Sequence, residues 1–440
     1  MISTANMESN LGYSFLLKLI TLSFQGDSAM VDYNVFTLPN GIRVVHKEVS
    51  NTKIVHCGFV LDIGSRDERK DQLGIAHFWE HMAFKGTKKR KAYHILNKLD
   101  AVGGELNAYT TKEKICFYAS VLDKHMESAF ELLQDITFDS IFPEKQIEKE
   151  RGVILEEMSL YHDSPEDAIQ DEFDRVVFGD HPLGKNILGT SDSVKSFQRE
   201  DFKAFLKTNL NTERIVFSCV GNIPLKKIQK LANKYFEPIP HHVGQRERVL
   251  FDNYVASSEV ITRNITQAQC AIGCTAYPIG HSKRLPFYML MNVLGGPGMN
   301  SRLNLALREK YGFVYSIDAG YHPFSDTGLF SIFFGTEMGQ VERGRKLVLK
   351  ELQKLRETPL GTMQLHMAKE QMLGQLAMGE ENNTSLMLMM GKSILDKNRI
   401  DSLESIFEKI RAVSSSDLIE VANEQLNENQ LSHLTFLPEN

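Results

Sequence analysis

The chain has 440 residues, of which 42 % are hydrophobic and 24 % are charged, and its formal net charge is −6. This length indicates about two to four domains, and the acidic balance argues against a duplex nucleic-acid binder, which needs a concentrated basic face. The sequence has no run of about 18 apolar residues that would predict a membrane span, and its five cysteines predict reduced, buried thiols without a disulfide framework.

The first 30 residues carry an apolar patch over residues 15–22, which Lys18 interrupts. No Lys or Arg precedes Leu11, so the segment lacks the positive region of a secretory signal peptide, and the absence of Arg disfavours a mitochondrial transit peptide. A strand-like segment begins directly after Met30. We therefore expect residues 1–30 to be a disordered or non-native extension, the folded protein to start near Met30, and the location to be cytoplasmic.

Strand-like and helical patterns then alternate along the chain. An Asn40-Gly41 pair between two apolar runs predicts a hairpin over residues 35–46. Periodicity predicts further strands at 54–64, 115–122, 268–277 and 328–337, and helices at 72–86, 125–135, 144–162 and from Leu285 onward.

An internal repeat relates the two ends of this pattern. When the segment from Val194 is aligned with the segment from Ile410, Asp201 matches Asp417 and Asn211 matches Asn427, and the apolar positions agree as well. Both copies predict a helix, an Asn-containing turn and a strand, with the helices at 199–208 and 415–424.

The repeat predicts an α+β fold of two homologous halves, each a mostly antiparallel sheet with helices packed on one face. The halves are expected at residues 31–236 and 249–440. A polar run with two prolines predicts a linker over residues 237–248.

The residues that indicate chemistry are His77, Glu80 and His81, within the sequence His-Phe-Trp-Glu-His. On a helix these three point to one face, and Phe78 and Trp79 point away. Two imidazoles one turn apart can bind one zinc ion, and the glutamate between them suits a base that acts on water. The alternative is a pair of hydrogen-bonded histidines on a buried helix.

A catalytic zinc site needs a third protein ligand. The carboxylate-rich helix over residues 144–163 offers Glu150 and Glu157, which lie two turns apart and therefore share a face. An ordinary solvated face accounts for the other glutamates of this helix, which are Glu144, Glu148 and Glu156.

The histidine motif, followed by Glu157 within the sequence ERGVILEEM, resembles the insulinase/pitrilysin family of zinc peptidases, in its mitochondrial-processing-peptidase-like branch. The resemblance extends from about Tyr33 to Leu437. It implies one Zn²⁺ per chain, with His77, His81 and Glu157 as ligands, Glu80 as the general base and Glu150 in a supporting role. The family usually has Leu at the position of Trp79, and we expect the Trp79 ring to pack behind the helix.

The resemblance also implies residues that handle the substrate. Asn107 and Ala108, on an edge strand, would hold an extended peptide beside the zinc, although Asn107 could instead cap the preceding turn. Arg308 and Tyr315 in the second half would hold the scissile carbonyl and stabilise the oxyanion. The alternative is a surface Arg and a half-buried Tyr.

The positions of the second half that correspond to the metal residues are Val293, Gly296 and Pro297, so only the first half is expected to bind metal. The function expected from the resemblance is a zinc-dependent endopeptidase that hydrolyses peptides or unfolded segments enclosed in a chamber. The alternatives are a non-catalytic structural or partner subunit of a processing-peptidase-like complex, and a module that only binds peptides.

The family resemblance further implies a homodimer, or a heterodimer with an inactive homologue. In such a dimer we expect Arg308 and Tyr315 to act on the metal site of the other protomer. The competing geometry is a clamshell within one protomer.

Overall fold

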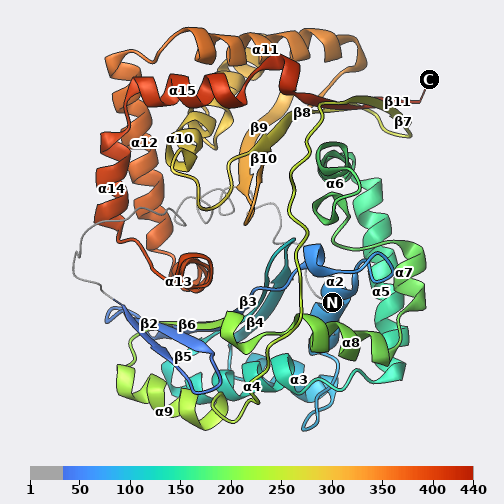
Figure 1. The fold of residues 1–440 in the computed structure, drawn as a ribbon, viewed down its shortest axis with the longest axis vertical. Coiled ribbons are helices and arrows are strands. Elements are labelled where there is room, and N and C mark those ends of the chain that lie inside the picture. The colour runs from blue at the N-terminus through green and yellow to red at the C-terminus, as the bar shows by residue number, and fades with distance from the viewer. Residues whose placement is uncertain (1–32, 440) are drawn as a thin grey trace.

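A computed structural model describes residues 33–439, and the expected extension over residues 1–30 lies outside the described residues. Two β-sheets organise the fold, one in each half of the chain (Figure 1). The first sheet has the strand order β1(Asn34–Thr37), β2(Arg43–Glu48), β6(Ile215–Gly221), β3(Ile54–Leu61), β5(Ile115–Leu122), β4(Glu105–Thr110). The second sheet has the order β7(Ser258–Arg263), β11(Ser432–Pro438), β8(Ala268–Ala276), β10(Gly328–Thr336), β9(Val314–Pro323).

Neighbouring strands in both sheets are antiparallel, except for the parallel pairs β2–β6 and β7–β11. The prediction of an α+β fold with two mostly antiparallel sheets is therefore confirmed. The predicted hairpin joins β1 to β2, and Gly41 in its turn has a φ of 91°, a conformation that favours glycine.

Helices fill the segments between the strands, and those predicted at 72–86, 125–135 and 144–162 correspond to α2, α4 and α5. The helices of the first half are α2(Ile75–Ala83), α3(Ala92–Asp100), α4(Met126–Phe138), α5(Glu144–Asp163), α6(Pro165–Phe178), α7(Ser191–Ser196), α8(Arg199–Asn209) and α9(Leu225–Tyr235). Those of the second half are α10(Arg284–Gly295), α11(Val341–Glu357), α12(Thr362–Glu380), α13(Asn383–Lys397), α14(Leu403–Ala412) and α15(Ser415–Gln425).

The repeat found in the sequence has a physical basis in these elements. Asp201 in α8 and Asp417 in α15 each accept the backbone N–H of the residue that caps their own helix. After each helix, Asn211 and Asn427 accept a backbone N–H before the strands β6 and β11 begin. The matched residues therefore start the helix and shape the turn in both halves.

One helix of each half packs on the sheet of the other half. Helix α13 of the second half packs on β3 and β6, and α6 of the first half packs on β8 and β11 (Figure 1). Gly391 permits the close approach of α13, because a Cβ there would lie 2.7 Å from Val60 Cγ2. The helices of each half thus cover one face of their own sheet, as predicted, and the exchanged helix covers the other face.

A buried ion pair also joins the halves. Arg66 is 3 % exposed, and its guanidinium contacts the Asp326 carboxylate at 2.5 and 2.6 Å and the Glu113 carboxylate at 2.7 Å. Residues 237–257 connect the halves without forming a helix or a strand. Within this segment we retain 237–248 as the proposed linker between proposed halves at 31–236 and 249–440.

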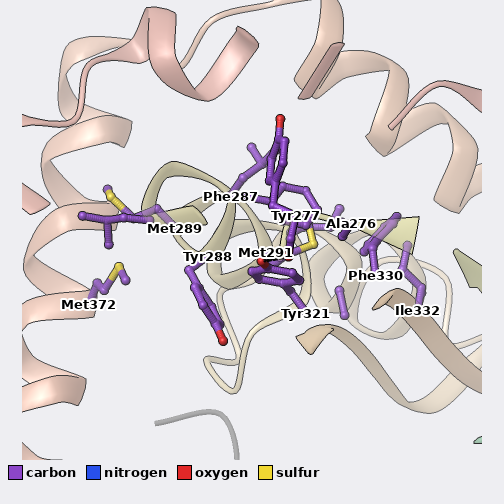
Figure 2. Close-up of a cluster of buried hydrophobic side chains, with 14 of the residues drawn as sticks. Ala276, Tyr277, Phe287, Tyr288, Met289, Met291, Tyr321, Phe330, Ile332 and Met372 are labelled. Atoms are coloured by element: carbon purple, nitrogen blue, oxygen red, sulfur yellow. Dashed lines mark hydrogen bonds between the residues drawn. The ribbon is translucent and has the colours of Figure 1, made fainter. Parts of the chain in front are cut away.

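The core of the second half is apolar and aromatic. Figure 2 shows part of it, where side chains from α10 meet side chains from β8, β9, β10 and α12; the labelled residues are Ala276, Tyr277, Phe287, Tyr288, Met289, Met291, Tyr321, Phe330, Ile332 and Met372. Across residues 33–439, every helix is too short or too polar to cross a membrane.

Candidate metal centre

The start of α2 is fixed by an acidic side chain and a glycine. The Glu68 carboxylate accepts the backbone N–H of Gly74 at 2.8 Å and that of Ala76 at 2.9 Å, which satisfies donors that a helix N-terminus leaves free. Gly74 has a φ of 92°, and a Cβ there would lie 2.4 Å from the Leu188 carbonyl oxygen. These contacts set where α2 begins and therefore which of its side chains face α5.

The two faces of α2 separate the polar residues from the apolar ones. His77, Glu80 and His81 lie on the face predicted from the sequence, and α5 packs against this helix. On the other face Trp79 is fully buried, with its ring edge-to-face on Phe117 at a centroid distance of 5.6 Å. The expectation that Trp79 packs behind the helix is confirmed.

Helix α5 brings Glu157 to the two imidazoles. Its Oε1 lies 3.7 Å from His77 Nε2, and its Oε2 lies 3.5 Å from His81 Nε2. One ligand atom from each residue lies within 4.8 Å of the others. A tetrahedral zinc ion with bonds of about 2.0–2.2 Å holds its ligand atoms about 3.5 Å apart. Both the spacing and the donor set of two nitrogens and one carboxylate therefore fit zinc.

Glu150 contacts this group from two turns earlier on α5. Its side chain is 2 % exposed, and its Oε2 accepts a hydrogen bond from His81 Nδ1 at 3.4 Å. The Lys85 ammonium lies 2.8 Å from the other carboxylate oxygen. A carboxylate behind a ligating histidine fixes the tautomer and the orientation of the ring, so His81 Nε2 is left to face Glu157.

Burial and charge give the two histidines different proton affinities. Burial, together with the adjacent His81, lowers the pKa of His77 to about 4. Burial opposes protonation of His81 as well, but hydrogen bonds to Glu150 and Glu157 outweigh it and raise the His81 pKa to about 9. The pKa of Glu157 lies below its usual value because the two imidazoles outweigh the effect of burial.

Glu80 lies beside these three side chains and contacts a strand residue that the sequence did not indicate. The Thr110 hydroxyl, at the end of β4, donates a hydrogen bond of 2.6 Å to Glu80 Oε2. Burial raises the pKa of Glu80 to about 6, and the bond from Thr110 partly opposes this rise. Strand alternation could have indicated Thr110, because it lies two residues after Ala108 and its side chain is on the same face of β4.

Asn107 and Ala108 lie on β4, the edge strand of the first sheet. Asn107 is exposed and pairs with Tyr118 of β5, while Ala108 is half-buried against the core of the first half. Helix α2 packs against this strand. The structure therefore places the open edge of β4 next to the helix that carries Glu80.

Arg308 and Tyr315 come together in the second half. Arg308 lies in a π-helical segment, Asn304–Glu309, and its guanidinium carbon is 5.7 Å from the ring centroid of Tyr315 at the start of β9. Tyr315 is 86 % exposed, and Arg308 forms its ion pair with Glu309. Arg308 and Tyr315 therefore lie beside each other, and they are not part of the group formed by His77, His81 and Glu157.

Similarity to known proteins extends over most of the chain. Residues 43–191 match the family described as insulinase (peptidase family M16), and residues 196–372 match the peptidase M16 inactive domain. A protein of Bacillus subtilis named uncharacterized zinc protease YmxG is 32 % identical over 86 % of this chain and 92 % of its own length. An uncharacterized zinc protease of Rickettsia felis is 33 % identical over 89 % of this chain and 94 % of its own.

Solved structures share the same fold. The crystal structure of a protease from Helicobacter pylori superposes with a TM-score of 0.86 at 22 % identity and covers 92 % of this chain and 99 % of its own. A structure described as a peptidase M16 inactive domain from Pseudomonas fluorescens superposes with a TM-score of 0.87 at 17 % identity, over 93 % of this chain and 99 % of its own.

Proposed function

This chain belongs to the insulinase family of zinc proteases, peptidase family M16, and we propose that it is an endopeptidase that hydrolyses peptides or unfolded polypeptide segments enclosed in a chamber. The observation that carries the proposal is the convergence of His77, His81 and Glu157 within 4.8 Å, with Glu80 beside them. We propose one Zn²⁺ per chain, held by these three side chains.

Residues of the first half have separate roles in the proposed reaction. Zinc bound there would supply a Lewis acid that polarises the scissile carbonyl and makes water a better nucleophile near neutral pH. Glu80 takes the proton from the attacking water and passes it to the leaving amine. Glu150 holds the His81 ring in place, and the Thr110 hydroxyl holds one oxygen of Glu80, which leaves the other oxygen for the proton.

We propose that the substrate binds as an extra strand on the edge of β4, beside Asn107 and Ala108. Main-chain hydrogen bonds along such an edge depend little on the side chains of the peptide. An extended or unfolded segment can offer these bonds, whereas the backbone of a folded protein is already paired. This supports peptides and unfolded segments as the substrate class.

Arg308 and Tyr315 are proposed to hold the scissile carbonyl and stabilise the oxyanion. Their mutual contact and the high exposure of Tyr315 support a role toward a partner that lies outside their own half. We propose that they act on the metal site of a second protomer, in a homodimer or in a heterodimer with an inactive homologue. The proposed location is the cytoplasm, which cell fractionation tests.

A non-catalytic partner subunit is the alternative function, and a module that only binds peptides is another. Neither accounts for a complete set of two histidines, a carboxylate as the third ligand and a partly buried glutamate beside them. The deciding experiment compares the zinc-loaded wild type with E80Q on an internally quenched peptide. We expect E80Q to keep its zinc and lose hydrolysis. Full hydrolysis by E80Q would overturn the assignment of the base, and no hydrolysis by the wild type would favour the alternatives.

A further inference from the structure

A lysine from the second half reaches the edge strand of the first half. Lys392 lies on α13, the helix that crosses to the first sheet, and its side chain is half-buried. The Lys392 ammonium is 5.0 Å from the ring centroid of Tyr109 on β4. The strand proposed to hold the substrate therefore has a cation from the other half beside it.

No ion pair or hydrogen bond joins this cation to an acidic side chain within the part of the chain that the structure describes. The Lys392 ammonium faces the Tyr109 ring, and among residues 33–439 no hydrogen bond or ion pair joins it to another residue. Asp396, one turn further along α13, pairs instead with Lys114 at 2.8 Å. Burial, with a contribution from Lys114, lowers the pKa of Lys392, although Cys116 and the Asp396 carboxylate oppose this shift. A partly buried ammonium without a partner is costly, and a carboxylate would offset that cost.

The two faces of β4 look toward different surroundings. Leu106 and Ala108 pack against the core of the first half, whereas Tyr109 packs against the core that includes α13. Asn107 shares the face of Tyr109, because side chains alternate along a strand. In a peptide strand added to this edge, every second side chain would stand on the Tyr109 face, where Lys392 lies.

We propose that Lys392 selects peptides that carry an Asp or Glu side chain on the Tyr109 face of the bound strand. The substrate carboxylate accepts a charge-assisted hydrogen bond from Lys392 Nζ and becomes the anionic partner that the lysine lacks in the protein. This inference rests on the proposed function, because it assigns a substrate preference to the same edge strand. Through Lys392, the second half would then determine part of the substrate specificity at a metal site formed by residues of the first half.

The test uses internally quenched peptides in which one Glu is moved position by position, each matched to a peptide with Gln at that place. We expect wild-type kcat/KM to be roughly tenfold higher for Glu than for Gln at one position or at positions two apart. At the positions between them, kcat/KM should be equal for the Glu and the Gln peptide. K392M should bring this Glu/Gln ratio to about one, and K392R should keep it. K397M, on the same helix, is the matched control and should retain the wild-type ratio.

A Glu/Gln ratio that survives in K392M, or that stays near one at every position of the wild type, overturns the role of Lys392. Absence of hydrolysis for every peptide would instead overturn the proposed function. In that case, fluorescence anisotropy of the same peptides on zinc-loaded protein gives the Glu/Gln ratio of affinities. The wild type and K392M should differ in that ratio if Lys392 selects acidic side chains, and equal ratios contradict the inference.

Discussion

The Thr110 hydroxyl donates a hydrogen bond of 2.6 Å to Glu80 Oε2, and it does so from the same strand that carries Asn107 and Ala108. The proposed base is therefore held by the strand proposed to hold the substrate. A peptide that docks on the edge of β4 is placed relative to Glu80 through a single rigid element. This connection would keep a substrate bound at the strand at a fixed position relative to Glu80 on the helix during proton transfer.

Replacement of Thr110 by valine should lower kcat more than it raises KM. Valine keeps the shape of the side chain but removes the hydroxyl, so Glu80 loses the bond that fixes one of its oxygens. We expect a fall in kcat of about 10- to 100-fold, with zinc content unchanged. T110S restores the hydroxyl and should recover most of the activity. Equal kcat values for T110V and the wild type would show that Thr110 does not position Glu80.

Replacement of Glu150 by glutamine should weaken zinc binding. The change removes the charge that fixes the His81 ring and leaves Lys85 without its carboxylate partner. The expected loss of zinc affinity is about 10- to 100-fold, measured by competition with a chelator of known affinity. The matched control is E148Q, because the Glu148 side chain on the same helix is 76 % exposed. Identical zinc affinities for E150Q and E148Q would contradict a supporting role for Glu150.

Sharing of residues between protomers predicts complementation. R308A and E80Q should each be inactive alone. In an equimolar mixture, half of the dimers contain one of each chain, and each mixed dimer has one complete site if Arg308 acts across the interface. Hydrolysis should then recover to about a quarter of the wild-type rate. A mixture as inactive as its components would assign Arg308 to the metal site of its own protomer.

The exchange of helices between the halves predicts a stability effect at Gly391. In G391A the new Cβ would meet Val60 Cγ2 at 2.7 Å and Ser218 Cβ at 3.3 Å. We expect the free energy of unfolding to fall by about 1–3 kcal/mol, because α13 must move away from the first sheet. Chemical denaturation measures the change. The matched control is G374A in α12, where nothing lies within 4 Å of the new Cβ and a gain of about 0.5–1 kcal/mol is expected.

The faces that carry the candidate metal residues could be predicted because each face is local to one helix, whereas the meeting of the two helices followed only from the family resemblance. The spacing of His77 and His81 fixes their common face, and the two turns between Glu150 and Glu157 fix theirs. The sequence also indicated the helix, turn and strand repeated around Asn211 and Asn427, because residues at a cap or a turn contact their own neighbours. Each of these features depends on separations of a few residues.

The contacts between distant segments could not be predicted in the same way. The apolar pattern of α13 shows that the helix is buried, but not that it is buried on the sheet of the other half. The contact of Lys392 with Tyr109 and the bond from Thr110 to Glu80 depend on that tertiary arrangement. The pairing of Arg308 with Tyr315 depends on the path of the chain between a π-helical segment and β9.

The most direct test is a titration of Zn²⁺ into chelator-treated protein while hydrolysis of a quenched peptide is followed. The account predicts no hydrolysis after chelation, a rise that saturates at one ion per chain, and no rise in H77A, H81A or E157Q at the same zinc concentration. Hydrolysis that persists in the chelated wild type, or that is restored equally in E157Q, would contradict the claim that these three side chains hold a catalytic zinc ion.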